Sequence, residues 1–582
     1  MLKTILSQIK EYKRASIATP VFMLLEVAME TIIPMQMASI VTDGVEKGDI
    51  KHIYLMGVLM IITALASLSF GWMGAKYGAK ASMGLGKNLR KEMFRKIQTY
   101  SFANIDHFST AGLVTRMTTD VTNIQNAYQM VLRMAMRALA TILCAMFMSF
   151  YISPKLSTIY LVAVIALGLF LFIISSCAMK YFQRSFEKYD ELNESVQENV
   201  SAIRVVKSYV REEHEKKKFE TASSNIYKLF TKAESLVVYN APVMQFTVYT
   251  CMLLISWFGA HFVVQNTLDT GNFMALLTYC MNILMNLMML SMIFVMISIS
   301  MGSLRRVSEV LSEESTLKNP KNPVYDVPDG SIVFNNVTFR YSKSSETPVL
   351  DNINLSIKSG ETIGIIGGTG SSKSSLVNLI SRLYDVNEGS VSVGGIDVRS
   401  YDMDALRNQV SVVLQQNVLF SGTILDNLRW GDKNASEEEC INACKMACAD
   451  EFIQTFPDKY DTHIEQGGTN VSGGQKQRLC IARALLKKPK ILILDDSTSA
   501  VDTATDAKIR KALKAAIPGT TKIIIAQRIS SVMDADRIIV LDDGRLDGFG
   551  THEELLASNT IYRDVYEAQT NGGGDFDEGG AN

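Results

Sequence analysis

Long runs without a charged side chain are the feature that most constrains this chain. The segments Ile53–Ala75, Leu156–Met179, Ser235–Leu268 and Thr270–Leu304 contain no Asp, Glu, Lys or Arg. A mostly apolar run of about 18 residues is already long enough to cross a membrane as a helix. No such run recurs after Arg305. The sequence therefore excludes a wholly soluble protein, and it predicts a membrane part followed by a soluble part.

Six transmembrane helices are predicted from these runs and from two further apolar segments. Their approximate bounds are 18–41, 53–75, 132–153, 156–178, 239–264 and 273–300. Lys and Arg concentrate before the first span and in the long connections after the second and fourth spans. The positive-inside rule places those segments in the cytoplasm of a protein of the cell membrane. The soluble part follows the sixth span and is therefore expected on the same side.

Four parts are predicted along the chain. Residues 1–310 hold the six spans and long cytoplasmic helices, and residues 311–330 form a polar linker that contains prolines. Residues 331–570 alternate apolar strands with helices, as α/β folds do. Residues 571–582 form a flexible tail rich in Gly and Asp. The chain has 58 Lys and Arg against 59 Asp and Glu, so nucleic acid is not expected as a partner.

A phosphate-binding loop is predicted near the start of the soluble domain. An apolar strand ends at Ile366, a Gly- and Ser-rich loop follows, and a helix begins, which is the context that a P-loop requires. Backbone N–H groups of such a loop bind phosphate, the Lys373 ammonium reaches the β/γ-phosphates, and the Ser374 hydroxyl is a ligand for Mg²⁺. The residues assigned to this site are Gly367, Gly368, Thr369, Gly370, Ser371, Ser372, Lys373, Ser374 and Ser375.

Two other segments carry groups that a nucleotide site needs. The apolar strand Ile491–Leu494 leads into Asp495, and a carboxylate at the end of a buried strand can bind Mg²⁺. The segment Val471–Gln475 precedes a helix whose first N–H groups form an anion site. Each pattern alone is also typical of an ordinary buried strand or a capped helix. The P-loop upstream makes the metal-binding interpretation of Asp495 the stronger one.

Together these segments resemble the ATP-binding cassette (ABC) family over nearly the whole chain. The resemblance implies the type I (type IV) exporter fold, in which a six-helix membrane domain is fused to a cytosolic α/β P-loop NTPase domain. It also implies ATP and Mg²⁺ as cofactors, and two cassettes that clamp each ATP between one P-loop and the opposing signature. Coupling turns near Ser101–His107 and Tyr209–Glu213 are implied to contact the cassettes.

The resemblance assigns further residues to the nucleotide site. Tyr341 is implied to stack on adenine, and Gln415 is implied to contact the nucleotide and its Mg²⁺. Asp502, in the sequence Ser499–Asp502, belongs to the segment that the family calls the D-loop. The signature residues are Ser472, Gly473, Gly474 and Gln475.

Three positions depart from the family pattern. Ser372 stands where a glycine precedes the lysine, Asp496 where the catalytic glutamate follows Asp495, and Gln527 where the switch histidine is found. The shorter Asp496 is poorly placed to act as a general base, which needs about 2.6–3.2 Å to its proton, and Gln527 cannot carry an imidazolium charge. The pattern is similar to the degenerate-site subunit of heterodimeric bacterial multidrug exporters. A second half-transporter with an intact Glu and His is therefore expected as the partner.

Two carboxylates in the first span are candidates for substrate contact. Glu26 and Glu30 lie four residues apart, hence on one helix face. Carboxylates at this depth are costly and face a cavity or a partner group. They are candidates for attracting cationic substrates, but a structural pairing with Arg133 or Arg137 is the favoured interpretation.

The predicted function is ATP-driven export of amphipathic small molecules from a lipid membrane, as one half of a heterodimer. Lipid or peptide export is the alternative within transport, and a membrane regulator that senses ATP without transport is the alternative outside it. An active homodimer would require Asp496 to serve as the general base.

Overall fold

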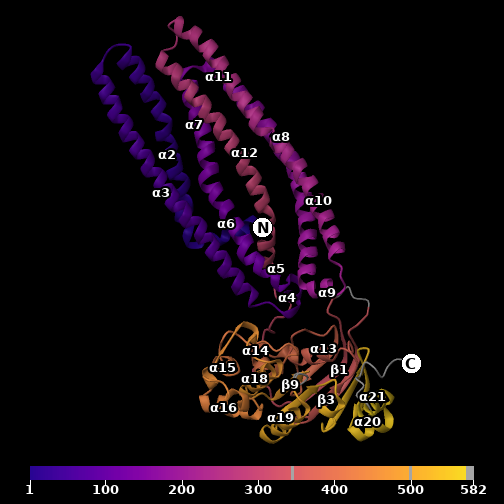
Figure 1. The fold of residues 1–582 in the computed structure, drawn as a ribbon. Helices are drawn as coiled ribbons and strands as arrows, with labels where there is room; N and C mark the ends of the chain where they lie inside the picture. The colour runs from indigo at the N-terminus through magenta and orange to yellow at the C-terminus, as the bar shows by residue number, and fades with distance from the viewer. Residues whose placement is uncertain (343–346, 497–500, 572–582) are drawn as a thin grey trace. The chain divides into compact units, whose positions relative to one another are not determined.

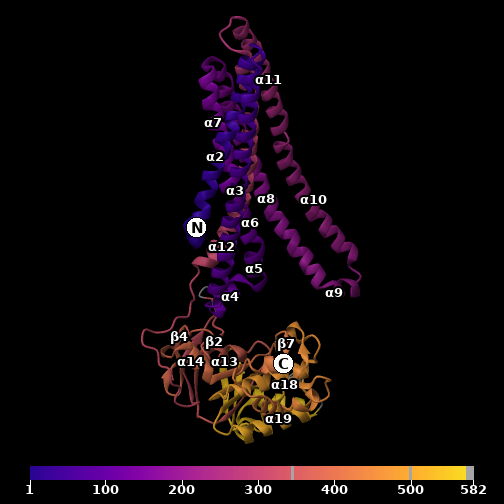
Figure 2. The same cartoon turned by 90° about the vertical axis from the view of Figure 1, so that its left-hand side faces the viewer.

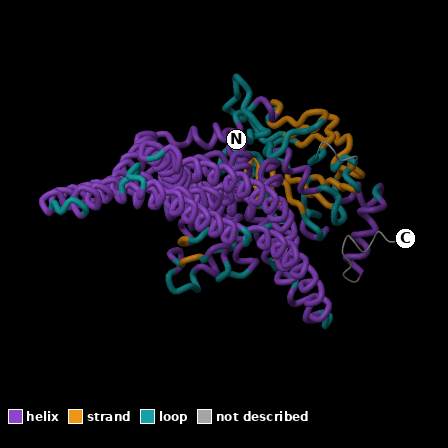
Figure 3. Tube along the Cα trace, turned by 90° about the horizontal axis from the view of Figure 1, so that it is seen from above, coloured by secondary structure: helices purple, strands orange, loops and turns teal. Residues whose placement is uncertain are grey.

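The computed structural model describes residues 1–342, 347–496 and 501–571. They form two compact units (Figure 1). One unit comprises Met1–Thr99 and Phe108–Glu313, and the other comprises Tyr100–His107 and the chain from Glu314 onward. Figure 3 shows that the first unit is built of helices and that the strands belong to the second. The expected tail, 571–582, lies almost entirely outside the described residues.

Among the described residues, six helical stretches of the first unit are long and apolar enough to cross a membrane, which confirms the six predicted spans. The main helices of these stretches are α2 (Lys13–Ser39), α3 (Ile50–Ile97), α7 (Met136–Ile152), α8 (Pro154–Ser201), α11 (Asn240–Val264) and α12 (Thr270–Ser312). Two starts follow from local chemistry. The Asp49 side chain accepts from the first amides of α3, and Pro154, which lacks an N–H, begins α8.

Shorter helices complete the first unit and part of the second. α10 (Glu212–Val237) lies beside α8, and toward α9 (Ile203–Ser208) this pair diverges from α3, α6 (Val121–Gln129) and α12 (Figure 2). α8 also contacts α12. Three short π-helical segments, Ile40–Val45, Arg116–Asp120 and Met130–Ala135, interrupt the long helical stretches. The remaining helices up to Val237 are α1 (Leu2–Leu6), α4 (Phe102–Phe108), α5 (Thr110–Thr115), α6 (Val121–Gln129), α9 (Ile203–Ser208) and α10 (Glu212–Val237).

Small residues allow α2 and α3 to approach closely. A Cβ on Gly74 would lie 2.1 Å from Cε of Met23, and a Cβ on Gly71 would lie 2.9 Å from Oε1 of Glu26. Glycine at these positions lets the backbones of two membrane helices come together, where dispersion contacts replace contacts with lipid. This packing places the Glu26 carboxylate against α3 at Gly71.

The second unit is an α/β domain, as predicted. Its main sheet has the order β12-β11-β3-β10-β9-β6, and all neighbours are parallel except β11 and β12. β9 and β10 are buried along their whole length, as expected for parallel strands covered on both faces. These six strands are β3 (Thr362–Ile366), β6 (Val410–Val413), β9 (Ile491–Asp495), β10 (Thr521–Ile525), β11 (Arg537–Asp542) and β12 (Arg545–Gly550).

A second, antiparallel sheet of order β2-β1-β4-β5 packs in the same unit. Its strands are β1 (Ile332–Phe339), β2 (Leu350–Ile357), β4 (Glu388–Val393) and β5 (Ile396–Asp397), and a short pair is formed by β7 (Gly422–Thr423) and β8 (His463–Ile464). The helices are α13 (Lys373–Ile380), α14 (Met403–Gln409), α15 (Ile424–Leu428), α16 (Glu437–Met446), α17 (Asp450–Ile453), α18 (Gly473–Leu486), α19 (Thr503–Ala516), α20 (His552–Ser558) and α21 (Thr560–Asn571).

Candidate nucleotide site

The predicted P-loop connects β3 to α13. Its lysine is bonded to the loop itself, since Nζ of Lys373 donates to the carbonyl oxygens of Gly367 at 2.7 Å and Gly368 at 2.8 Å. Gly367 has no room for a side chain, because a Cβ there would lie 2.3 Å from the Leu541 carbonyl oxygen. Backbone N–H groups at the start of α13 complete an arrangement suited to phosphate.

Ser372 adopts a backbone conformation that favours glycine. Its φ of 70° and ψ of 23° are left-handed, a region that costs an L-residue roughly 1–2 kcal/mol. The expectation that a side chain strains the loop at this position therefore has a geometric basis.

Asp495 lies at the end of β9 beside the first turn of α13. It is 5% exposed, and burial raises the pKa of its carboxyl group above the usual range, an effect that a hydrogen bond with Ser374 opposes. A hydroxyl and a carboxylate at one point are the hard oxygen ligands that Mg²⁺ prefers. These two residues therefore fit the predicted metal site.

Two side-chain amides lie near the Asp496 carboxylate. Nε2 of Gln527 lies 3.4 Å from Oδ2 of Asp496, and Nε2 of Gln415 lies 3.5 Å from the same oxygen. Both distances are at the long end of the hydrogen-bond range. The structure thus brings together, at the end of β9, three residues that the sequence named separately.

Tyr341 stands at the other side of the P-loop helix. Its hydroxyl shares a hydrogen bond of 2.9 Å with the Ser375 hydroxyl. The residue is 49% exposed, and its ring lies edge-on to those of Phe339 and Tyr384. An exposed aromatic ring bonded to the first turn of α13 fits the expected stacking on a base, which stays a prediction.

The signature segment begins α18 as a capping box. Ser472 N donates to Oε1 of Gln475 at 2.9 Å, and Gln475 N donates to Oγ of Ser472. This leaves the N–H groups of Gly473 and Gly474 at a helix N-terminus. Asp502 caps α19 by accepting from Thr505 N at 2.9 Å, while Ser499 and Ala500 lie outside the described residues.

Sequence reasoning missed a contact between the C-terminal helix and the Gln527 segment. The Gln569 side chain, on α21, donates to the Gln527 carbonyl oxygen at 3.0 Å and accepts from Ile529 N at 2.9 Å. On the same segment, the Ser531 hydroxyl donates to the buried Asp506 carboxylate at 3.0 Å. No local pattern marks Gln569, because its partners lie some 40 residues away in the chain.

In the membrane unit, one arginine joins both acidic candidates. Nη1 of Arg137 lies 3.2 Å from Glu26, and Nη2 lies 2.8 Å from Glu30. The structural pairing with Arg137 that the sequence favoured is therefore formed, while substrate contact stays a prediction. Glu30 and Arg137 also line a polar cavity of about 260 Å³, together with Thr31, Thr141, Asn282 and Asn286.

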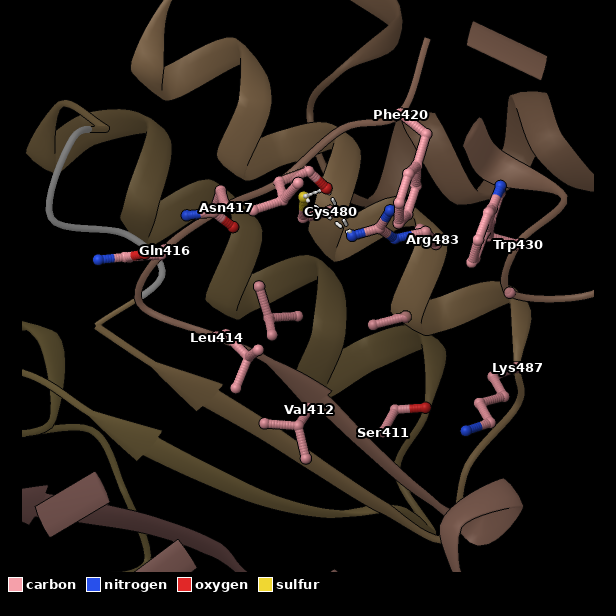
Figure 4. Close-up of a pocket in the computed structure, with 14 residues that line it drawn as sticks. Ser411, Val412, Leu414, Gln416, Asn417, Phe420, Trp430, Cys480, Arg483 and Lys487 are labelled. Atoms are coloured by element: carbon pink, nitrogen blue, oxygen red, sulfur yellow. Dashed lines mark hydrogen bonds between the residues drawn. The ribbon is translucent and has the colours of Figure 1, made fainter. Parts of the chain in front are cut away.

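A second cavity lies in the cassette unit (Figure 4). It has a volume of about 350 Å³ and is lined from β6, from the segment after Gln415 and from α18. The rings of Phe420 and Trp430 are stacked 4.0 Å apart on one side of it. The lining is mostly apolar, with Ser411, Gln416 and Asn417 as neutral polar groups, and Arg483 and Lys487 add positive charge.

Comparison with known proteins identifies both parts of the chain. Residues 17–288 match the model of the ABC transporter transmembrane region, and residues 350–499 match the ABC transporter model of the ATPase domain. Two proteins of Bacillus subtilis strain 168, named as the uncharacterized ABC transporter ATP-binding proteins YfiB and YknV, are similar to it. YfiB is 36% identical over 97% of this chain and 98% of its own, and YknV is 30% identical over 97% and 94%.

A solved structure shares the fold. It is described as a bacterial Atm1-family ABC exporter with ATP bound, and it superposes with a TM-score of 0.83 over 96% of this chain and 99% of its own at 24% identity. The two family models and the full-length relatives show that the chain belongs to the ABC transporter family, with one multi-pass membrane domain and one ATPase domain, and the solved structure shows that it shares the fold of an ABC exporter.

Proposed function

We propose that this chain is one half of a heterodimeric exporter that moves amphipathic compounds of the multidrug type. In this proposal it resides in the cell membrane with its N-terminus and cassette in the cytoplasm. It binds Mg²⁺-ATP at its own P-loop, hydrolyses it slowly, and supplies an intact signature to the site of its partner. The observation that carries the proposal is the environment of Asp496.

Asp496 is a weak candidate for a general base. A general base accepts a proton from the attacking water, and its oxygen must lie about 2.6–3.2 Å from the water oxygen to do so. The Asp496 carboxylate is one methylene shorter than glutamate, and Oδ2 faces the amides of Gln415 and Gln527. Neither amide can accept a proton or carry a positive charge, so ATP binding is retained while hydrolysis is slow.

Two surfaces support a partner that also has a membrane domain. The turn after α9 exposes large apolar side chains, with Tyr209 at 74% and Val210 at 80% exposure. The cavity beside Phe420 and Trp430 in the cassette is a receptor of matching chemistry (Figure 4). We propose that the turn after α9 of this chain docks into the equivalent cavity of the partner half-transporter. The turn of the partner docks into the cavity beside Phe420 and Trp430, so the heterodimer has two such contacts.

The polar cavity at Glu30 and Arg137 is the substrate contact in this proposal. Of the two carboxylates that share the Arg137 guanidinium, only Glu30 lines the cavity, and the Asn282 and Asn286 amides add both donors and acceptors. An amphipathic cation with hydrogen-bonding groups fits this lining, since charged groups inside a membrane protein face a polar cavity.

The test is the steady-state ATPase rate of the full chain purified alone in nanodiscs, with binding of labelled ATP measured on the same sample. We expect saturable ATP binding with turnover at least tenfold slower than that of the assembled pair. Rapid turnover by the chain alone would replace the heterodimer with an active homodimer.

Transport is tested with the assembled pair in sealed vesicles. ATP-dependent accumulation of an amphipathic dye is the expected result. Accumulation of labelled lipid or peptide instead would change the substrate class. No accumulation of any of these, despite ATP binding, would favour a membrane regulator that senses ATP.

A further inference from the structure

One turn of the chain belongs to the cassette unit although it follows a membrane helix. Residues Tyr100–His107 come directly after α3, yet they form part of the unit that contains the chain from Glu314 onward. The Ser101 and Thr316 hydroxyls share a hydrogen bond of 2.6 Å, and Nδ2 of Asn104 donates to the Glu314 carbonyl oxygen at 3.2 Å. These contacts hold the first part of the turn to the segment that leads into the cassette.

Tyr384 holds the other end of the same turn. It follows α13, the helix that begins at the P-loop lysine, and its hydroxyl donates to Oδ2 of Asp106 at 2.8 Å. Burial and the bond to the Asp106 carboxylate raise the pKa of Tyr384 above its usual value. The ring of Phe102 lies 6.2 Å from that of Tyr384, so the turn contacts both the polar and the apolar part of this side chain.

The ring of Tyr384 also contacts Tyr341, the expected platform for the base. The ring centroids of Tyr384 and Tyr341 are 5.0 Å apart with planes at 87°, which is the edge-to-face geometry that aromatic pairs prefer. The buried ring of Phe339 lies 5.7 Å from Tyr384 and 4.8 Å from Tyr341. A base that stacks on Tyr341 thus meets a ring whose position depends on Tyr384.

We propose that Tyr384 is a positioning residue that links the Tyr341 platform to Asp106, so that a base bound on Tyr341 and the conformation of the 100–107 turn influence each other. The inference rests on the nucleotide site of the proposed function. It adds that the base, and not only the phosphates, acts on the turn that continues α3. Such coupling is reciprocal, because two linked binding equilibria must shift each other by the same factor.

The inference is tested by comparing two ligands that differ in the base. The full chain in nanodiscs is saturated with either a hydrolysis-resistant imido analogue of ATP or ribose 5-triphosphate, each with Mg²⁺. Hydrogen exchange of the amides of residues 101–107 is then measured. We expect the ATP analogue to slow exchange at least threefold more than ribose triphosphate does.

Two variants each remove one side of the hydrogen bond between Tyr384 and Asp106. Tyr384→Phe keeps the ring and loses the donor hydroxyl, and Asp106→Ala removes the acceptor. We expect each to reduce the ratio between the two ligands to about one, and the double variant to do no more than either alone. Tyr325→Phe is the matched control, since Tyr325 lies in the same unit and is 70% exposed; the ratio should remain unchanged.

The outcomes separate this inference from the function on which it rests. If neither triphosphate binds, the nucleotide site itself is wrong, and the inference fails with it. If both bind but protect the turn equally in the unmodified chain, the link from the base is absent. If the threefold ratio persists in Tyr384→Phe, the signal does not pass through the Tyr384 hydroxyl, and the assigned role of this residue is overturned.

Discussion

The side-chain amide of Gln527 lies 3.4 Å from Oδ2 of Asp496, so the two residues that replace the histidine and glutamate of the family pattern meet each other. Asp496 has a φ of 46°, in the left-handed region that aspartate tolerates better than most residues. Asp496 therefore combines a backbone in this region with two neutral donors to its carboxylate, the amides of Gln415 and Gln527. A substitution at only one of these positions leaves the other with the residue that departs from the family pattern. Glu at 496 and His at 527 should therefore be introduced together.

The double variant Asp496→Glu with Gln527→His is expected to raise ATP hydrolysis by the full chain at least tenfold. The longer carboxylate extends toward the attacking water, and the imidazole supplies a donor that can carry charge; a general base contributes about 10²–10⁴-fold. The measurement is phosphate release by the chain alone and with its partner. Adding Lys373→Ala should abolish the gain. An unchanged rate would mean that these two residues do not limit hydrolysis.

Ser372→Gly is expected to tighten binding of Mg²⁺-ATP by about two- to fivefold. Glycine reaches the left-handed conformation of residue 372 without steric cost, and it removes a Cβ beside the phosphates. Stability should change by less than about 1 kcal/mol, because relief of strain is offset by the larger entropy of glycine in the unfolded chain. Calorimetry gives the affinity. Ser372→Ala, which keeps the Cβ, should behave as the unmodified chain, and equal tightening by both variants would contradict the explanation.

Gln569→Ala is expected to loosen the Gln527 segment without unfolding α21. Two hydrogen bonds are lost, to the Gln527 carbonyl and from Ile529 N, whereas the buried Tyr562 and Val565 still anchor the helix. Hydrogen exchange at residues 527–531 should become at least fivefold faster. Gln569→Glu keeps the acceptor for Ile529 N and should give an intermediate rate. If exchange of the whole of α21 rises equally, the effect is a loss of the helix and not of the contact.

The elements and the contiguous parts of the site follow from the sequence, and the long-range contacts do not. A mostly apolar run of about 18 residues without charge marks a span, and a P-loop is a local strand–loop–helix pattern. Asp495, Asp496 and Lys373 were therefore identifiable by position. The Tyr384–Asp106 bond joins residues 278 apart, and no periodicity encodes it. Similarly, helix spacing placed Glu26 and Glu30 on one face, but only tertiary packing puts Arg137 between them.

Lys522→Met is expected to stabilise the cassette at neutral pH and to lose this advantage in alkali. Lys522 is 3% exposed on β10, and burial lowers the pKa of its ammonium group. The folded-state pKa thus lies below the unfolded value of about 10.4. The cost of burying the charge is full below the folded-state pKa, falls as pH rises, and vanishes above the unfolded value.

The gain at pH 7 should be about 1 kcal/mol, or roughly 2–4 °C in the unfolding temperature of a domain of this size. Thermal unfolding of the full chain in detergent at pH 7 and pH 10 measures it. Lys511→Met, at an exposed position of α19, is the control and should show little effect at either pH. An advantage of Lys522→Met that grows toward pH 10 would have the wrong sign for a buried ammonium.

Arg137→Met is expected to destabilise the membrane unit by about 1–3 kcal/mol, because it leaves the carboxylate of Glu26 buried without its cation. Glu26 is 7% exposed, and its Oε2 already has no hydrogen-bond partner among the described residues. Adding Glu26→Gln to Arg137→Met should recover most of the loss, since no buried charge then remains. The unfolding temperature in detergent measures both effects.

Glu30→Gln separates a structural role from substrate contact, because the Glu30 side chain is far more exposed than that of Glu26. We expect it to reduce transport of a cationic dye by the assembled pair while leaving the unfolding temperature nearly unchanged. A fall in unfolding temperature with normal transport would instead assign Glu30 to the ion pair alone.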